Sequence, residues 1–184
     1  VSFLVSRGYT SVVLVGHSTG ANKVCYYAGS VSDPRVAGVV LAGPMSDRYS
    51  AGFDAATNRE HRRIMEQKIN EGKGDELLMG YDFFPLTPKR WMSLLAEGSP
   101  EDVFNYRDDV GALSAFSVIK APLLVIFAGK DEHADRPVEI IRNAFDAHAT
   151  SPVYKSIIVP DADHGFSGKE ALFVKEIVSW AALL

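Results

Sequence analysis

The pentapeptide Gly-His-Ser-Thr-Gly at residues 16–20 constrains the fold of this chain more than any other feature of its sequence. A short β-branched run at residues 11–15 leads directly into it and is typical of a buried parallel strand. Behind it, apolar residues recur at helical spacing through residues 21–28, and Gly29 is placed to close that helix. The pattern predicts a strand, a sharp turn and a helix, with the hydroxyl of Ser18 held out at the end of a sheet.

Three further apolar runs, each ended by glycine or proline, predict buried strands at residues 36–42, 123–128 and 153–159. Helical stripes follow the last two of these runs, and the final helix is preceded by the capping-box pattern Ser167-x-x-Glu170. Strands and helices therefore alternate at both ends of the chain. This order predicts an α/β fold built on a doubly wound, mostly parallel sheet.

The middle of the chain, from about residue 44 to 117, has no convincing strand pattern and predicts a helical cap inserted between two strands. Residues 58–71 form a charged, weakly amphipathic helix candidate, and Thr87-Pro88 and Ser99-Pro100 are both typical of helix starts. Four aromatic residues of the insertion are expected either to form a pocket wall or to pack a small cap core: Tyr81, Phe83, Phe84 and Trp91.

A serine nucleophile needs a base that takes its proton and an acid that orients the base. His164 follows the fourth predicted strand and is the predicted base. Asp131 directly follows the third strand and is the predicted acid, which gives the chain order serine, acid, histidine. Asp47, after the second strand, is the alternative acid.

Thr19 and His17 flank Ser18 and are the predicted oxyanion and substrate-binding residues. The backbone N–H of Thr19 stands at the start of the predicted helix, where it is free to stabilise an oxyanion. The side chain of His17 is expected to point away from Ser18.

Several classes of site and partner are excluded by composition. The single cysteine, Cys25, rules out an internal disulfide and a cysteine-based metal site, and it is compatible with a cytoplasmic location. No metal-binding or nucleotide-binding motif occurs, so neither a metal nor a cofactor is predicted. A net charge of −4 argues against nucleic acid as a partner. No apolar run reaches the roughly 20 residues of a membrane span, which leaves a small-molecule substrate as the predicted partner.

These motifs resemble those of the α/β-hydrolase superfamily, because GHSTG, GKDE and DADHGF each follow a predicted strand. The chain resembles more closely a hydrolase family that includes fungal siderophore esterases, in the segments GHSTGANKV, GPMSDR, EGKGDELL, PLTPKRWMSLL and GKDEHAD. The resemblance implies Ser18 as nucleophile, Asp131 as acid and His164 as base. It also implies a serine hydrolase that cleaves a small-molecule carboxylic ester through an acyl-enzyme, with siderophore esters as substrates of some relatives.

The sequence departs from the superfamily pattern on its N-terminal side. A complete fold of this class has roughly eight strands with the serine turn after the fifth, whereas four strands are predicted here. We therefore expect residues 1–184 to be a partial α/β-hydrolase domain that lacks the first strands and the loop carrying the second oxyanion donor. Such a fragment is expected to be poorly stable and weakly active by itself.

Two other functions stay open at this level. A hydrolase-like fold also serves non-catalytic ligand-binding proteins, since fold does not fix function. The same three residues also serve an amidase, a peptidase or a cofactor-free haloperoxidase.

Overall fold

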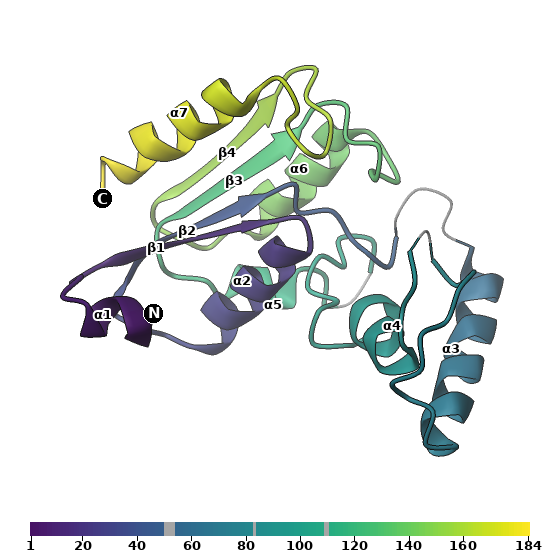
Figure 1. Cartoon of the computed structure of the whole chain (residues 1–184). Helices are drawn as coiled ribbons and strands as arrows, with labels where there is room; N and C mark the ends of the chain where they lie inside the picture. The colour runs from purple at the N-terminus through teal and green to yellow at the C-terminus, as the bar shows by residue number, and fades with distance from the viewer. Residues whose placement is uncertain (50–53, 83, 109–110) are drawn as a thin grey trace.

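The computed structural model describes residues 1–49, 54–82, 84–108 and 111–184. Within them, the strands form a four-stranded parallel sheet in the order β1-β2-β3-β4 (Figure 1). The strand bounds are β1 Val12–His17, β2 Val36–Ala42, β3 Leu123–Ala128 and β4 Tyr154–Val159. All four lie where the apolar runs predict them, which confirms the α/β class.

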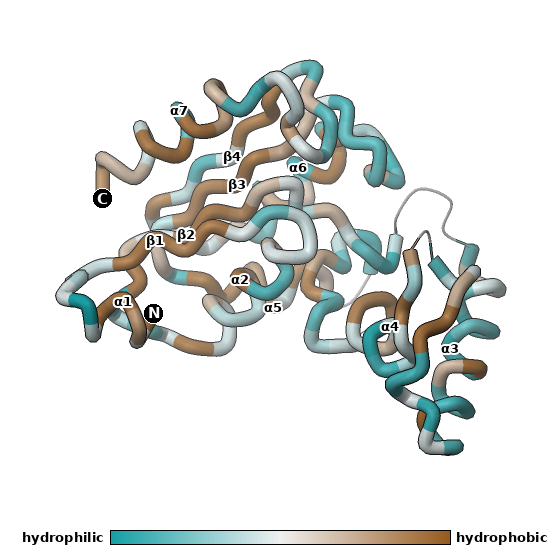
Figure 2. The backbone as a smooth tube through the Cα atoms, viewed as in Figure 1, coloured by the Kyte–Doolittle hydropathy of each residue, from teal (hydrophilic) through white to brown (hydrophobic). Residues whose placement is uncertain are grey.

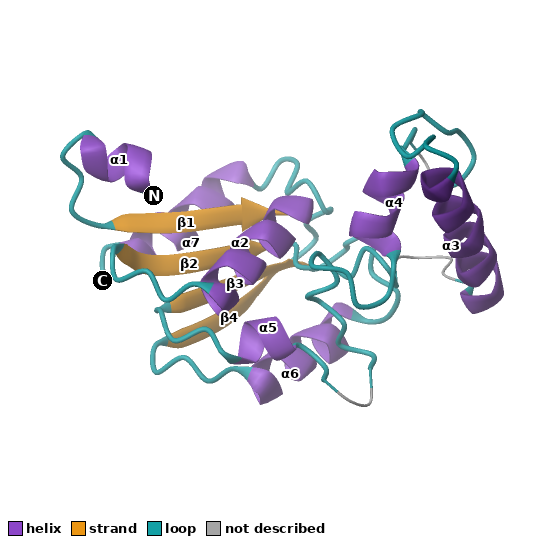
Figure 3. Cartoon of the chain, turned by 90° about the horizontal axis from the view of Figure 1, so that it is seen from below, coloured by secondary structure: helices purple, strands orange, loops and turns teal. Residues whose placement is uncertain are grey.

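Helices cover both faces of this sheet, as Figures 1 and 3 show from two directions. Helices α2, α5 and α6 pack on one face, and α7 packs on the other. The helix bounds are α1 Ser2–Ser6, α2 Thr19–Ser30, α3 Ala55–Asn70, α4 Pro88–Leu95, α5 Ser114–Ser117, α6 Val138–His148 and α7 Glu170–Ala181. Across the described ranges, no helix has the length and apolar character needed to cross a membrane.

The two central strands are apolar throughout, as their colour in Figure 2 shows. Both of their faces are buried, as is typical of a parallel sheet. On β2, Val39 and Leu41 pack against α2 and α6, whereas Val40 and Ala42 pack against α7. The same alternation occurs on β3. This two-sided burial explains why the strands read as continuous runs instead of alternating patterns.

Phe145 of α6 is the centre of the larger core. Its fully buried ring lies 4.9 Å from that of Phe116, 5.3 Å from that of Phe127 and 5.6 Å from that of Phe104, measured between centroids. These neighbours come from α5, from β3 and from the segment that leads into α5. One side chain therefore joins the sheet to the end of the middle segment.

Helices α3 and α4 form a separate unit beyond the carboxyl ends of the strands, which we call the cap (Figure 1). Its own small core contains Met65, Leu86, Trp91 and Ala96. The hydroxyl of Thr87 accepts a hydrogen bond from the backbone of Arg90 and caps α4, as Thr87-Pro88 predicts. The cap core is distinct from the two cores that flank the sheet.

The rest of the middle segment packs into the main core and not into the cap. Val103, Phe104, Leu113 and Phe116 are buried in the core beneath the sheet. A buried arginine of the preceding loop, Arg48, ties this part down through ion pairs with Asp102 at 3.0 Å and Asp108 at 2.7 Å. The chain from 44 to 117 thus contributes both to the cap and to the main core.

Two predicted helix starts are wrong. Ser99 accepts a hydrogen bond from the backbone of Asp102, but the residues between them form a turn instead of a helix. The last helix starts at Glu170, and the capping box does not form. Phe166 and Gly168 have positive φ values of 56° and 70°, which no α-helix accommodates.

Phe145→Ala is expected to lower the free energy of unfolding by about 3–5 kcal/mol, because the vacated space is walled by three other rings. Ile140 lies on the same helix with 53% of its surface exposed, so Ile140→Ala is expected to change stability by less than about 0.5 kcal/mol. Equilibrium urea denaturation followed by circular dichroism measures both variants. Equal effects of the two changes would contradict the assignment of this core.

Candidate active site

Ser18 stands at the junction of β1 and α2 in a conformation that serine rarely adopts. Its φ is 57° and its ψ is −131°. The Ser18 N–H donates to the carbonyl of Ala42 on β2 at 3.0 Å, and its own carbonyl accepts from Ala21 at 2.8 Å. The sheet and the helix together hold the strained turn, so the side chain leaves the backbone at the end of the sheet.

The two glycines of the turn differ in their surroundings. A Cβ atom on Gly16 would lie 2.4 Å from the carbonyl oxygen of Gly20 and 2.7 Å from Cα of Ala21. A Cβ atom on Gly20 would meet nothing within 4 Å. The absence of a side chain therefore relieves crowding at Gly16 and not at Gly20.

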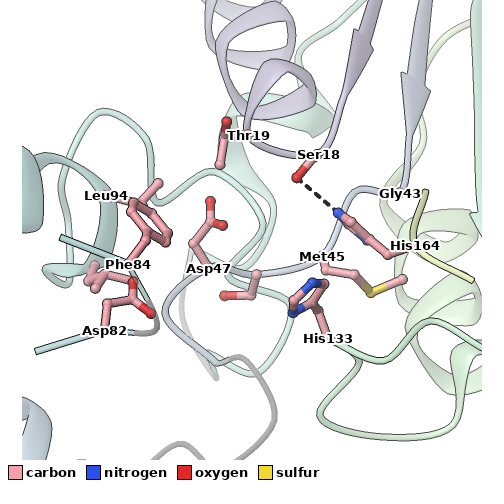
Figure 4. Close-up of a pocket in the computed structure, with 12 residues that line it drawn as sticks. Ser18, Thr19, Gly43, Met45, Asp47, Asp82, Phe84, Leu94, His133 and His164 are labelled. Carbon is pink, nitrogen blue, oxygen red and sulfur yellow. Dashed lines mark hydrogen bonds between the residues drawn. The ribbon is translucent and has the colours of Figure 1, made fainter. Parts of the chain in front are cut away.

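The structure brings together the three residues predicted as nucleophile, base and acid. Nε2 of His164 lies 2.9 Å from Oγ of Ser18 (Figure 4). Nδ1 of the same ring lies 2.8 Å from Oδ2 of Asp131. With Nδ1 protonated, His164 donates a hydrogen bond to Asp131 and accepts one at Nε2 from the Ser18 hydroxyl. Asp131 is buried, and its other oxygen accepts from the backbone of His133 at 3.0 Å. These contacts hold the carboxylate in one orientation.

Two hydrogen bonds join the loop that carries Asp131 to the loop that carries His164. The N–H of Lys130 donates to the carbonyl of Ala162 at 2.8 Å, and the N–H of His164 donates to Glu132 at 2.9 Å. Glu132 was not among the residues predicted for this site. Its acceptor role depends on a contact across 32 positions, which leaves no local signal in the sequence.

His17 contacts the backbone of the loop that carries His164. Its Nε2 is 2.7 Å from the backbone carbonyl of His164, to which it donates when protonated there. The two imidazole rings are 5.3 Å apart, and the ring of Phe166 is 5.8 Å from that of His17. The ring supports the loop of His164 and is not among the described residues that line the cavity, whereas Thr19 is.

The pKa of His164 reflects opposing influences. Burial of the ring lowers its pKa, but the hydrogen bond and the negative charge of Asp131 outweigh burial. The charges of Glu132 and Asp47 act in the same direction as Asp131. The pKa of His164 therefore lies above its ordinary value, so the neutral base forms at a somewhat higher pH than in a free histidine.

A cavity opens beside Ser18, between the edge of the sheet and the cap (Figure 4). Its apolar lining is Met45, Phe84, Leu94 and Leu95, and its polar lining is Ser18, Thr19, Ser46, Asp47, Asp82, His133 and His164, with Gly43 between them. Of the aromatic residues expected here, Phe84 lines the cavity. Trp91 is buried in the cap core, Tyr81 packs on His61 at 4.9 Å, and Phe83 lies outside the described residues.

Asp47, the alternative acid, makes its hydrogen bond elsewhere. Its Oδ2 accepts from the amide of Asn22 at 2.8 Å, while Asp131 occupies the position against Nδ1 of His164. Asn22 is buried on α2 one turn beyond Ser18, and its amide also reaches the carbonyl of Glu101 at 2.9 Å. Burial raises the pKa of Asp47 to about 6, since the bond from Asn22 only partly compensates and the charge of Glu101 adds to the shift.

Sequence comparisons place this chain among proteins of one family. Residues 4–181 match the model of a family described as "Protein of unknown function (DUF1749)". Among curated proteins, the fusarinine C esterase sidJ of Aspergillus fumigatus is 24% identical over 217 residues, which cover 86% of this chain and 61% of that protein. The chain thus spans about three fifths of the length of this relative.

Solved structures share its fold. The esterase domain of a Rhodothermus marinus protein is similar with a TM-score of 0.54 and 19% identity, over 98% of this chain and 64% of that one. The monoacylglycerol lipase of Paleococcus ferrophilus is similar with a TM-score of 0.59 and 16% identity, over 97% and 72%. An α/β-hydrolase-fold protein of unknown function gives 0.60 and 21%, over 81% and 54%. These likenesses show the α/β-hydrolase fold that the motifs predict.

Gly16→Ala is expected to destabilise the chain by about 1–3 kcal/mol, because the new methyl group meets backbone atoms that cannot yield without opening the turn. Gly20→Ala is the matched change two residues beyond Ser18, within helix α2. It is expected to be neutral or to stabilise by up to about 1 kcal/mol. Thermal and urea unfolding of the two variants measure the difference, and a larger loss at Gly20 would contradict the described packing.

Proposed function

This chain belongs to the DUF1749 family, and from the geometry of its candidate site we propose that it is a serine hydrolase that cleaves carboxylic esters of small molecules. The observation that carries the proposal is the 2.9 Å contact between Oγ of Ser18 and Nε2 of His164, at a turn with positive φ. A hydroxyl held against a neutral imidazole is the arrangement that activates a serine nucleophile.

In the proposed reaction, His164 takes the proton of Ser18 as Oγ attacks the ester carbonyl carbon. The negative charge on the carbonyl oxygen is stabilised by the backbone N–H of Thr19 at the start of α2. The tetrahedral intermediate collapses, His164 gives its proton to the leaving alcohol, and the acyl group stays on Ser18. His164 then takes a proton from a water molecule as its oxygen attacks the acyl carbon. The bond from that carbon to Oγ breaks, His164 returns the proton to Ser18, and the acid is released.

Asp131 keeps the imidazole oriented and stabilises its charged form in this scheme. His17 supports the same loop through the backbone of His164. The cap side of the cavity, with Phe84, Leu94 and Asp82, is the surface against which the acyl or alcohol part of the substrate packs. The curated relative named as a fusarinine C esterase makes a siderophore-type ester the first natural substrate to test.

Labelling with a fluorophosphonate tests the nucleophile directly. Wild-type protein is expected to gain one adduct in its intact mass, because an activated serine attacks the phosphorus centre as it attacks a carbonyl. Ser18→Ala is expected to abolish the adduct, and His164→Ala is expected to slow its formation by about a hundredfold or more. Ser32→Ala removes an exposed hydroxyl after α2 and serves as the control.

The same experiment distinguishes the competing functions. Folded wild-type protein that forms no adduct would overturn the proposal and favour a non-catalytic ligand-binding protein. An adduct at Ser18 together with hydrolysis of amides but not of esters would retain the nucleophile and replace the esterase by an amidase or peptidase. Circular dichroism of each sample establishes that the labelled protein is folded.

The pH dependence of kcat/KM tests the base. Since His164 acts as a base only when neutral, activity is expected to rise with pH through a midpoint above about 6.5. Asp131→Asn removes the negative charge of the group that contributes most to raising the pKa of His164, so it is expected to move this midpoint to lower pH. The variant is also expected to lower kcat by roughly ten-thousand-fold. A midpoint that stays in place after this substitution would exclude Asp131 as the partner of the base.

A further inference from the structure

The cavity beside Ser18 is acidic. Two carboxyl groups line it: Asp47 comes from the loop after β2, and Asp82 comes from the cap (Figure 4). Among the described residues that line the cavity there is no lysine or arginine. A ligand that approaches Ser18 therefore meets negative charge contributed by both the sheet edge and the cap.

The basic groups near Asp47 are paired with other carboxylates. Lys23 forms an ion pair with Glu101 at 3.0 Å, and the guanidinium of Arg90 also contacts Glu101. Arg48, next to Asp47 in the chain, pairs with Asp102 and Asp108. Within the described residues, the hydrogen-bond donor to Asp47 is the uncharged amide of Asn22. Among the described residues Asp47 thus forms no ion pair, although the positive charges of Arg90 and Lys23 lower its pKa in part.

A carboxylate in this position is costly unless a ligand compensates it. Asp47 is partly withdrawn from solvent, and burial raises its pKa only to about 6, so it is ionised at neutral pH. A cation entering the cavity restores the interaction that burial removed. The ring of Phe84 lines the same cavity, and aromatic faces attract quaternary and primary ammonium groups.

We propose that Asp47, assisted by Asp82, selects substrates that carry a cationic nitrogen close to the scissile ester. The assignment rests on the proposed function, because it takes Ser18 as the point of attack. It extends that function by naming a substrate class: ammonium-bearing esters in preference to neutral or anionic esters of the same shape. Asp47 acts on specificity in this scheme and does not orient His164.

A pair of esters that differ in charge alone tests the assignment. The first is the p-nitrophenyl ester of γ-trimethylammoniobutyrate, and the second is its carbon isostere, in which a tert-butyl group replaces the trimethylammonium group. The measured quantity is the ratio of kcat/KM for the cationic ester to that for the neutral ester. Any change in nucleophile or base affects both esters equally, so the ratio reports only the charge of the cavity.

Asp47→Asn keeps an acceptor for Asn22 and removes the charge. It is expected to lower the ratio by about tenfold, the scale of one desolvated charge pair. Asp82→Asn is expected to lower the ratio in the same direction, and it provides a second variant should Asp47→Asn fold poorly. Asp75→Asn removes an equal charge from an exposed position on the cap, where Asp75 pairs with Lys89, and is expected to leave the ratio unchanged.

Binding without turnover separates this assignment from the proposed function. The ethyl esters of the same two acids are titrated calorimetrically into Ser18→Ala and into the double variant Ser18→Ala, Asp47→Asn. Preferential binding of the cation that disappears in the double variant supports the role of Asp47, even if the wild type hydrolyses neither ester. Hydrolysis by the wild type with the same ratio in Asp47→Asn would overturn the role of Asp47 and leave the serine hydrolase standing.

Discussion

The parallel direction of the four strands determines where catalytic side chains can meet in this fold. Because β1 to β4 run in one direction, the segments that follow them leave the sheet at one edge. Ser18, Asp131 and His164 each stand in such a segment, so two hydrogen bonds of one imidazole join all three. A slip of one residue in a strand would turn its buried side chains to the wrong face. The burial that holds the sheet therefore also holds the site.

Much of the fold was predictable because a strand buried on both faces appears in the sequence as a continuous run of apolar residues. The runs at 36–42 and 123–128 are apolar at every position, and the strands occupy those residues. Helix ends were less predictable, because a capping residue serves a turn as well as a helix. Ser99 caps such a turn, and the positive φ of Phe166 postpones the last helix. Neither outcome is encoded within the few residues that a capping pattern covers.

In the candidate site, too, some residues were predictable from the sequence and others were not. Ser18, Asp131 and His164 were predictable because each follows a recognisable strand. The support around them was not, since the bond of His17 to the backbone of His164 and that of Glu132 to its N–H both cross the loops between strands. Asp47 also follows a strand, which made it an alternative acid. Its partner Asn22 lies on a different element, and that contact holds one oxygen of the carboxylate while Asp47 lines the cavity.

Because the cap has its own core, the residues that stabilise the sheet are different from the cap residues that line the cavity. Met65, Leu86 and Trp91 form a core separate from the two that flank the sheet, and Phe84 packs against that cap core. The side chains that the cap turns toward the cavity are therefore not needed to hold the sheet together. Substitutions at Phe84 or Leu94 can therefore accumulate during evolution without loss of the buried strands. The wall of the cavity that the cap supplies can therefore change its shape and polarity while the wall at the edge of the sheet, with Ser18 and His164, keeps its geometry.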